Sequence, residues 1–204
     1  ALLGLCPAEF TTCSLLGSPL RELTLLERAK KSSYIAQQSE IAQWTTVYEW
    51  CEFSRYAMEQ SGMESLEGKE AIEDALKAVN AWQFRHRELC SLSGGERQRA
   101  LFAGALAQET PLIFLDEPSA AFDPKVKQEF YRWLSDFKQK TFLVVTHDFQ
   151  QLAQNYTHIL GLKAGKIAFF GKTKEVLKIE NLNALFEVEF QQFKEGDAEF
   201  FYLR

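Results

Sequence analysis

Two apolar runs separated by an amphipathic segment constrain the fold of this chain more than any other feature. Residues 112–115 are continuously apolar between Pro111 and two carboxylates, and residues 141–146 repeat this pattern before His147 and Asp148. Continuous apolar runs of this length are typical of parallel strands that are buried on both faces. The segment between them, residues 124–139, has the length of a crossover helix. The sequence therefore predicts an α/β fold with two fully buried parallel strands.

Composition narrows the class of protein. The 204 residues are 46% hydrophobic and 25% charged, which predicts a packed core, and the formal net charge of −5 argues against a basic surface that binds nucleic acid. Four cysteines (Cys6, Cys13, Cys51, Cys90) show no C-x-x-C spacing, so we expect reduced, buried thiols rather than a zinc site or disulfides. No apolar run is long enough to span a bilayer, so any work at a membrane is expected from its water side.

Three zones differ in their residue pattern. Up to residue 44, turn residues alternate with a helical stretch at 23–31 and a β-prone run at 32–37, while residues 1–5 resemble the apolar face of a helix already under way. The second zone, to residue 92, is rich in helix formers and predicts a helical insertion whose aromatic residues form its core. The third zone carries the two strands and the helix between them.

The two strands end in side chains that suit phosphate chemistry. Ligands of open parallel sheets bind beyond the carboxyl ends of the strands, where Asp116, Glu117 and His147 fall. A carboxylate there can hold Mg²⁺, a second can orient or deprotonate water, and an imidazole can contact a phosphate. An acidic pair alone is a weak signal, because acids are common at strand ends. His86 and His158 have no comparable setting and are interpreted as structural.

A small-residue loop before a helical segment adds a phosphate-binding element. Ser93, Gly94, Gly95 and Glu96 lie at a predicted helix start, where backbone N–H groups without partners attract anions. The common phosphate-binding loop G-x-x-x-x-G-K-[ST] does not occur in the sequence. Residues 171–173 read Gly-Lys-Thr, but Gly165 is one residue too far back and the intervening residues are strand-like. We interpret that segment as the edge of a hairpin.

In their order along the chain these features resemble the ATPase subunit of ABC transporters. Residues 92–96 resemble the signature motif, residues 112–116 the Walker B strand and residues 119–123 the D-loop, which ends at Asp123. The single residues that match are Gln37 for the Q-loop glutamine, Glu117 for the catalytic glutamate and His147 for the switch histidine. The resemblance implies ATP and Mg²⁺ as cofactors.

The same resemblance implies a role for each matching residue. Gln37 and Asp116 would serve Mg²⁺, and Glu117 would polarise the attacking water. His147 would sense the γ-phosphate. Members of the family sandwich two ATP molecules between two subunits, so the signature loop would contact an ATP held by the facing subunit. The remaining nucleotide contacts implied are Ser93, Gly94, Gly95, Glu96 and Asp123.

The implied fold is α/β, a P-loop NTPase-like (RecA-like) core of parallel strands with a helical subdomain. Residues 1–44 would complete the N-terminal half of the core and include the Q-loop, residues 45–92 form the helical subdomain, residues 93–185 the C-terminal half, and residues 186–204 a tail. The family's first strands and P-loop would precede Ala1. We therefore expect residues 1–204 alone to be inactive.

The finer resemblance is to importers of ferric siderophores, haem or cobalamin. It is carried by residues 17–37, 45–50, 54–58, 162–177 and 183–190. It implies a homodimer that drives membrane-spanning permease subunits, indirect contact with a periplasmic or surface binding protein, and a place on the cytoplasmic face of the cell membrane. The transported substrate is chosen by the other subunits and is not encoded here.

Two alternatives differ from this hypothesis. A catalytically incompetent partner chain would donate only its signature loop to another ATPase subunit, which fits the absence of G-x-x-x-x-G-K-[ST]. An ABC-type ATPase of DNA repair or chromosome structure would interrupt its motifs with a long coiled coil, but no extended heptad run lies between Gln37 and Leu92.

Overall fold

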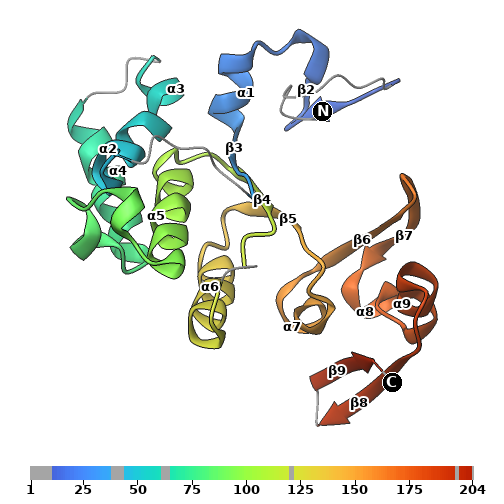
Figure 1. The fold of residues 1–204 in the computed structure, drawn as a ribbon. Coiled ribbons are helices and arrows are strands. Elements are labelled where there is room, and N and C mark those ends of the chain that lie inside the picture. Colours follow the sequence, from blue (N-terminus) through green and yellow to red (C-terminus); the bar gives the residue numbers. More distant parts are fainter. Residues whose placement is uncertain (1–10, 38–43, 61–64, 120–121, 196–197, 204) are drawn as a thin grey trace. The chain divides into compact units, whose positions relative to one another are not determined.

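The chain consists of two compact units, Ala1–Val145 and Thr146–Arg204, and each is described by itself. In the computed structural model the described residues are 11–37, 44–60, 65–119, 122–195 and 198–203 (Figure 1). The helix expected at residues 1–5 lies outside them. Within the described residues, no helix is both long enough and apolar enough to cross a bilayer.

A parallel sheet of three strands is the centre of the first unit (Figure 1). Its strands are β3 (Ser32–Ile35), β4 (Leu112–Asp116) and β5 (Thr141–Val145), in that spatial order. Ile35 lies opposite Leu115, and Asp116 lies opposite Val145. The sheet confirms the predicted α/β class, and it brings the carboxyl ends of β3, β4 and β5 to one edge.

The two predicted strands differ in burial. In β4, Ile113, Phe114 and Leu115 are 0%, 7% and 1% exposed, as expected. In β5, by contrast, Leu143 and Val145 are 44% and 53% exposed, so the prediction of a fully buried second strand is wrong. Among the described residues β5 pairs only with β4, so it forms an edge of the sheet, where packing covers a strand less completely.

The helices of the first unit begin where the sequence offers capping residues. Thr24 and Thr46 each form a capping box with the glutamate three residues on, and Asp123 caps the helix that Pro124 opens. The helices are α1 (Leu25–Lys31), α2 (Val47–Ser54), α3 (Tyr56–Glu59), α4 (Ser65–Ala78), α5 (Gly94–Ala107) and α6 (Pro124–Asp136). Shorter elements are β1 (Ser14–Leu15), β2 (Ser18–Pro19), η1 (Leu20–Glu22), η2 (Trp82–Phe84) and η3 (Leu89–Ser91).

Helix α5 connects the helical zone to the sheet. Its last eight residues, Ala100 to Ala107, are all buried, and α2 and α4 both pack against it. Phe102 lies 5.6 Å from Phe130 and 5.9 Å from Trp133 between ring centroids, which joins α5 to α6. The signature loop therefore opens a helix that is fixed on several sides.

The second unit has its own small core. It contains η4 (Phe149–Gln151), α7 (Leu152–Asn155), α8 (Thr173–Val176), α9 (Ile179–Phe186) and two antiparallel hairpins, β6–β7 (His158–Lys163, Lys166–Lys172) and β8–β9 (Phe190–Glu195, Ala198–Leu203). Leu177, Leu182, Phe190 and Phe201 form the core. The hairpin predicted around residues 165–173 is confirmed. No element was predicted for residues 190–203.

Candidate nucleotide site

Asp116 and Glu117 stand at the point where β4 leaves the sheet. Asp116 is the last residue of β4 and is partly buried. Glu117 has a φ of +47°, in the left-handed region that non-glycine residues rarely occupy, and its N–H donates to the Val145 carbonyl at 2.9 Å. This hydrogen bond holds the glutamate backbone at the edge of β5, in a strained conformation of the kind that clusters at functional sites.

Tyr34 is a member of this site that sequence reasoning missed. Tyr34 lies opposite Phe114 in the register of β3 and β4, so side-chain alternation places its ring on the same face as Asp116. Its hydroxyl lies 3.5 Å from Oδ2 of Asp116 and donates to it. Desolvation, followed by the negative charge of Asp116, raises the pKa of Tyr34 above its ordinary value. The sequence feature that could have identified Tyr34 is its position in the β-prone run 32–37, three residues before Gln37.

Gln37 follows β3 by two residues and is exposed. Because β3 and β4 are parallel neighbours, Gln37 and Asp116 follow from adjacent strands at one edge of the sheet. Their side chains offer amide and carboxylate oxygens, which are the donors that Mg²⁺ prefers. The described residues hold no group of three or more His, Cys, Asp or Glu side chains that could bind a metal. Two protein oxygens still fit Mg²⁺, which usually keeps waters and takes phosphate oxygens.

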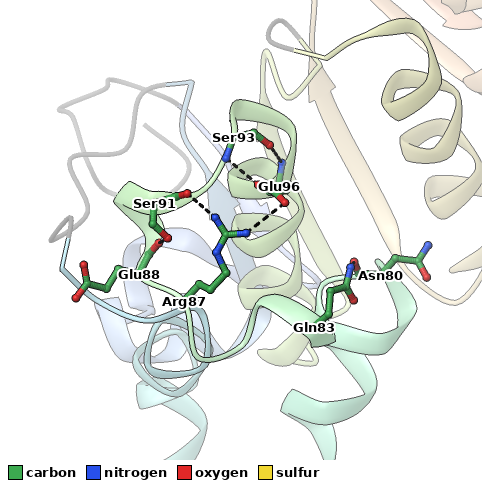
Figure 2. Close-up of polar contacts among 7 residues, drawn as sticks. All are labelled: Asn80, Gln83, Arg87, Glu88, Ser91, Ser93 and Glu96. Atoms are coloured by element: carbon green, nitrogen blue, oxygen red, sulfur yellow. Dashed lines mark hydrogen bonds and ion pairs between the residues drawn. The ribbon is translucent and has the colours of Figure 1, made fainter.

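Ser93 and Glu96 form a reciprocal capping box at the start of α5 (Figure 2). The Ser93 hydroxyl accepts from the Glu96 N–H at 3.3 Å, and the Ser93 N–H donates to Oε2 of Glu96 at 2.8 Å. The hydrogen bond from the Ser93 N–H to the carboxylate is the largest cause of the lowered pKa of Glu96, followed by the contact of the carboxylate with the Ser93 hydroxyl. The box uses two donors of the loop and leaves the N–H groups of Gly94 and Gly95 at the positive end of the helix.

The two glycines of the loop differ in their surroundings. A Cβ added at Gly94 would meet no atom within 4 Å, and one at Gly95 would meet Val126 at 3.5 Å, an ordinary contact. Neither glycine has a positive φ. Within the described residues, neither backbone strain nor crowding therefore requires glycine at position 94. The backbone at this position is accessible to a ligand or to another protein chain.

Helix α6 lies against the start of α5. Val126, in the first turn of α6, packs against Gly95, and Asp123 caps that turn by accepting from the Lys125 and Val126 N–H groups at 2.9 and 3.0 Å. Farther along, Arg99 forms an ion pair with Glu129 at 2.8 Å. The structure thus brings the signature loop and the end of the D-loop together, although Asp123 uses one carboxylate oxygen as a cap.

His147 belongs to the second unit and is exposed. The two units are described separately, so His147 is not placed relative to Asp116 or Glu117, which lie in the first. Its role therefore remains a prediction.

The cysteines are free in the described residues, but the expectation that they are buried is wrong for one of them. Cys51 is buried, Cys13 is partly buried, and Cys90 is exposed. Cys90 lies in η3, just before the signature loop, where the chain follows the surface. Cys6 lies outside the described residues.

The family is established by comparison with known proteins. A profile of the ABC transporter family matches residues 1–120. The chain belongs to this family, as an ATP-binding domain. It is 32% identical, over 91% of its length, to the petrobactin import ATP-binding protein FpuC of Bacillus anthracis, and 30% identical, over 85%, to the iron(3+)-hydroxamate import ATP-binding protein FhuC of Bacillus subtilis. It spans 70% of the first relative and 66% of the second.

Solved structures agree with the fold. An inward-facing metal-chelate type ABC transporter matches 85% of this chain and 71% of its own chain, with a TM-score of 0.72 and 27% identity. The protein cbiO1 of Clostridium perfringens, part of the ABC transporter complex cbiONQ, matches 78% of this chain and 64% of its own, with a TM-score of 0.65 and 22% identity. The second match supports the fold alone, which is that of the P-loop NTPases.

Proposed function

We propose that this chain is the ATP-hydrolysing part of an ABC importer that drives uptake of a metal chelate such as a ferric siderophore, haem or cobalamin. The relatives named for petrobactin and iron(3+)-hydroxamate import support this class of cargo. The metal-chelate transporter structure supports it independently.

The observation that carries the proposal is the geometry of the signature loop. Gly94 is the first residue of α5, where glycine loses more backbone freedom on folding than alanine would, and no contact or φ value within the described residues calls for glycine there. A group that approaches the loop from outside explains it, because a Cβ would keep such a group away from the backbone N–H. The end of the helix favours an anion, and in this family that anion is a phosphate of ATP.

The remaining site residues are proposed to act on the same nucleotide chemistry. Mg²⁺ bound with ATP neutralises charge on the phosphates. Asp116 and Gln37 would hold the ion, and Glu117 would orient and polarise the attacking water. The left-handed backbone of Glu117 supports this role, because it fixes where the carboxylate leaves the strand. His147 is proposed to contact the γ-phosphate, and Asp123 to shape the D-loop.

The proposed partners are a second copy of the subunit and membrane-spanning permease subunits, reached from the cytoplasmic face of the membrane. A binding protein would act indirectly, and we expect no nucleic acid among the partners. Trp44, Phe53 and Tyr56, on and beside α2 and α3, are 76%, 66% and 62% exposed and would be accessible to a protein partner.

The function is tested in the complete protein, assembled with its permease. Glu117→Gln and Gly94→Ala should each lower phosphate release from ATP by about 100-fold, whereas the exposed control Glu67→Gln should leave it unchanged. Uptake of radiolabelled ferric siderophore, haem and cobalamin in cells that lack the native subunit then identifies the cargo. ATP hydrolysis that survives Glu117→Gln at full rate would contradict the proposal.

The incompetent-partner alternative predicts a different pattern. In that case Glu117→Gln in this chain changes nothing, while Gly94→Ala lowers hydrolysis by the other subunit. Tight ATP binding by residues 1–204 alone would argue against this alternative.

A further inference from the structure

Arg87 occupies a fixed place beside the signature loop (Figure 2). It follows η2, and its backbone is held on both sides: its N–H donates to the Phe84 carbonyl at 2.8 Å, and its carbonyl accepts from the Val47 N–H at 3.0 Å. Its side chain is 45% exposed and points toward the start of α5. Two backbone hydrogen bonds therefore fix the position from which this long side chain extends toward Ser93.

The guanidinium group of Arg87 contacts the chain on both sides of Ser93. Nη2 donates to the Ser91 carbonyl at 2.5 Å, and Nη1 lies 3.5 Å from Oε1 of Glu96. The other carboxylate oxygen of Glu96 accepts the Ser93 N–H. One cation thus joins the end of η3 to the first turn of α5, across the loop that Figure 2 shows. The planar fork of arginine suits two such acceptors.

We propose that Arg87 is a positioning residue for nucleotide use by the signature loop, an inference that rests on the proposed function. Its first task is to fix the course of the chain from Ser91 to Glu96, and so the direction of the Gly94 and Gly95 N–H groups. Its second task is electrostatic. The capping carboxylate of Glu96 lies at the end of the helix that would face ATP, and its negative charge would repel the phosphates. The positive charge of Arg87 offsets part of it.

Arg85 provides a matched control. It lies two residues earlier on the same segment, stacks on the Trp82 ring at 4.3 Å and donates to the Trp82 carbonyl at 3.1 Å. These contacts stay within its own turn and do not involve the signature loop. Comparison of the Arg85 and Arg87 variants therefore distinguishes the effect of removing any arginine from this segment from the effect of removing the contact with Glu96.

The test compares Arg87→Gln, Arg87→Lys, Arg85→Gln and the double variant Arg87→Gln/Glu96→Gln in the complete, assembled protein. Arg87→Gln should lower the maximal ATPase rate about two- to fivefold and change the KM for ATP less than the rate. Arg87→Lys should recover part of the loss, and Arg85→Gln should match the wild type. The double variant should be faster than Arg87→Gln, because glutamine can still cap Ser93 but carries no charge.

Three results would overturn the proposal: an equal loss in Arg85→Gln, a double variant no faster than Arg87→Gln, or a rise in KM with an unchanged maximal rate. Amide exchange at Ser93 and Glu96 provides a readout that needs no ATP, and Arg87→Gln should accelerate it while Arg85→Gln should not. If wild type and Glu117→Gln hydrolyse ATP equally, the proposed function fails, while the exchange experiment still decides whether Arg87 fixes the loop.

Discussion

Adjacent residues at the end of β4 are held in different ways. Asp116 completes the ladder with β5 and shares its face of the sheet with Tyr34, whereas Glu117 turns into the left-handed region. Two carboxylates that are neighbours in sequence therefore leave the backbone in different directions. In the proposed function, this difference would allow Asp116 to hold a cation and Glu117 to reach a water molecule.

The charge of Glu96 makes a pH-dependent contribution to stability. Its folded-state pKa is lowered, so the contribution is complete above the ordinary glutamate pKa of about 4.3 and is lost as the pH falls through the lowered value. The wild type should therefore be more stable than Glu96→Gln at pH 7, and the gap should shrink steadily as the pH falls below the ordinary glutamate pKa. Urea midpoints of both proteins across this range measure it. A gap that widens on acidification would contradict the assignment.

The two thiols of the helical zone should differ in reactivity. Burial raises the pKa of Cys51 to about 12, and the pKa of the exposed Cys90 is raised by desolvation and by the Glu88 carboxylate, which lies 3.5 Å from its sulfur. Iodoacetamide should modify Cys90 slowly at pH 7.5 and faster at pH 9.5, and Glu88→Gln should accelerate the reaction at the lower pH. Cys51 should react only after denaturation. Peptide mass spectrometry locates the label, and rapid labelling of native Cys51 would show the packing to be wrong.

At the scale of elements, α5 depends on the absence of a side chain where α2 crosses it. A Cβ at Gly104 would collide with Nε1 of Trp50 and lie 2.8 Å from Oγ of Ser54. Gly104→Ala should therefore lower the free energy of unfolding by about 1–3 kcal/mol. Gly94→Ala, at the open end of the same helix, should leave it unchanged or raise it slightly. Thermal unfolding of both variants provides the comparison, and equal stability of the two would refute close packing at Gly104.

Most elements of the first unit could be predicted, because their signals are local. The strands β3 and β4 and the helices α1 and α6 follow from periodicity and capping residues alone. The exposure of β5 could not be predicted. An apolar run indicates that a strand is able to pack in a core, but it does not indicate which neighbouring elements cover the strand. The contacts of Tyr34 with Asp116 and of Arg87 with Glu96 were missed for a related reason. Each depends on where two separate elements meet.

At the scale of the whole molecule, the proposed site is shared between two subunits, so defects in different parts should complement each other. A dimer of one Gly94→Ala and one Glu117→Gln subunit contains one site with an intact signature loop and an intact glutamate. Mixing the two inactive variants before assembly should restore up to about a quarter of the wild-type ATPase rate, since half of the dimers are mixed.

The control for this mixture is the double variant Gly94→Ala/Glu117→Gln combined with either single variant, which leaves no intact site. Rates are measured on the assembled protein at a fixed total concentration. Affinity tags show whether mixed dimers have formed. If they have formed and the mixture of single variants shows no recovery, Gly94 and Glu117 act in the same subunit's own site.

The left-handed backbone of Glu117 also has a consequence for engineering. A domain of this kind is stable by only about 5–15 kcal/mol, and a non-glycine residue in this region gives up roughly 1–2 kcal/mol of it. Replacement by glycine would relieve that strain and remove the carboxylate at once. If Glu117 has its proposed role, a library selected for heat resistance alone would enrich inactive proteins at this position, and only selection for transport would retain the glutamate.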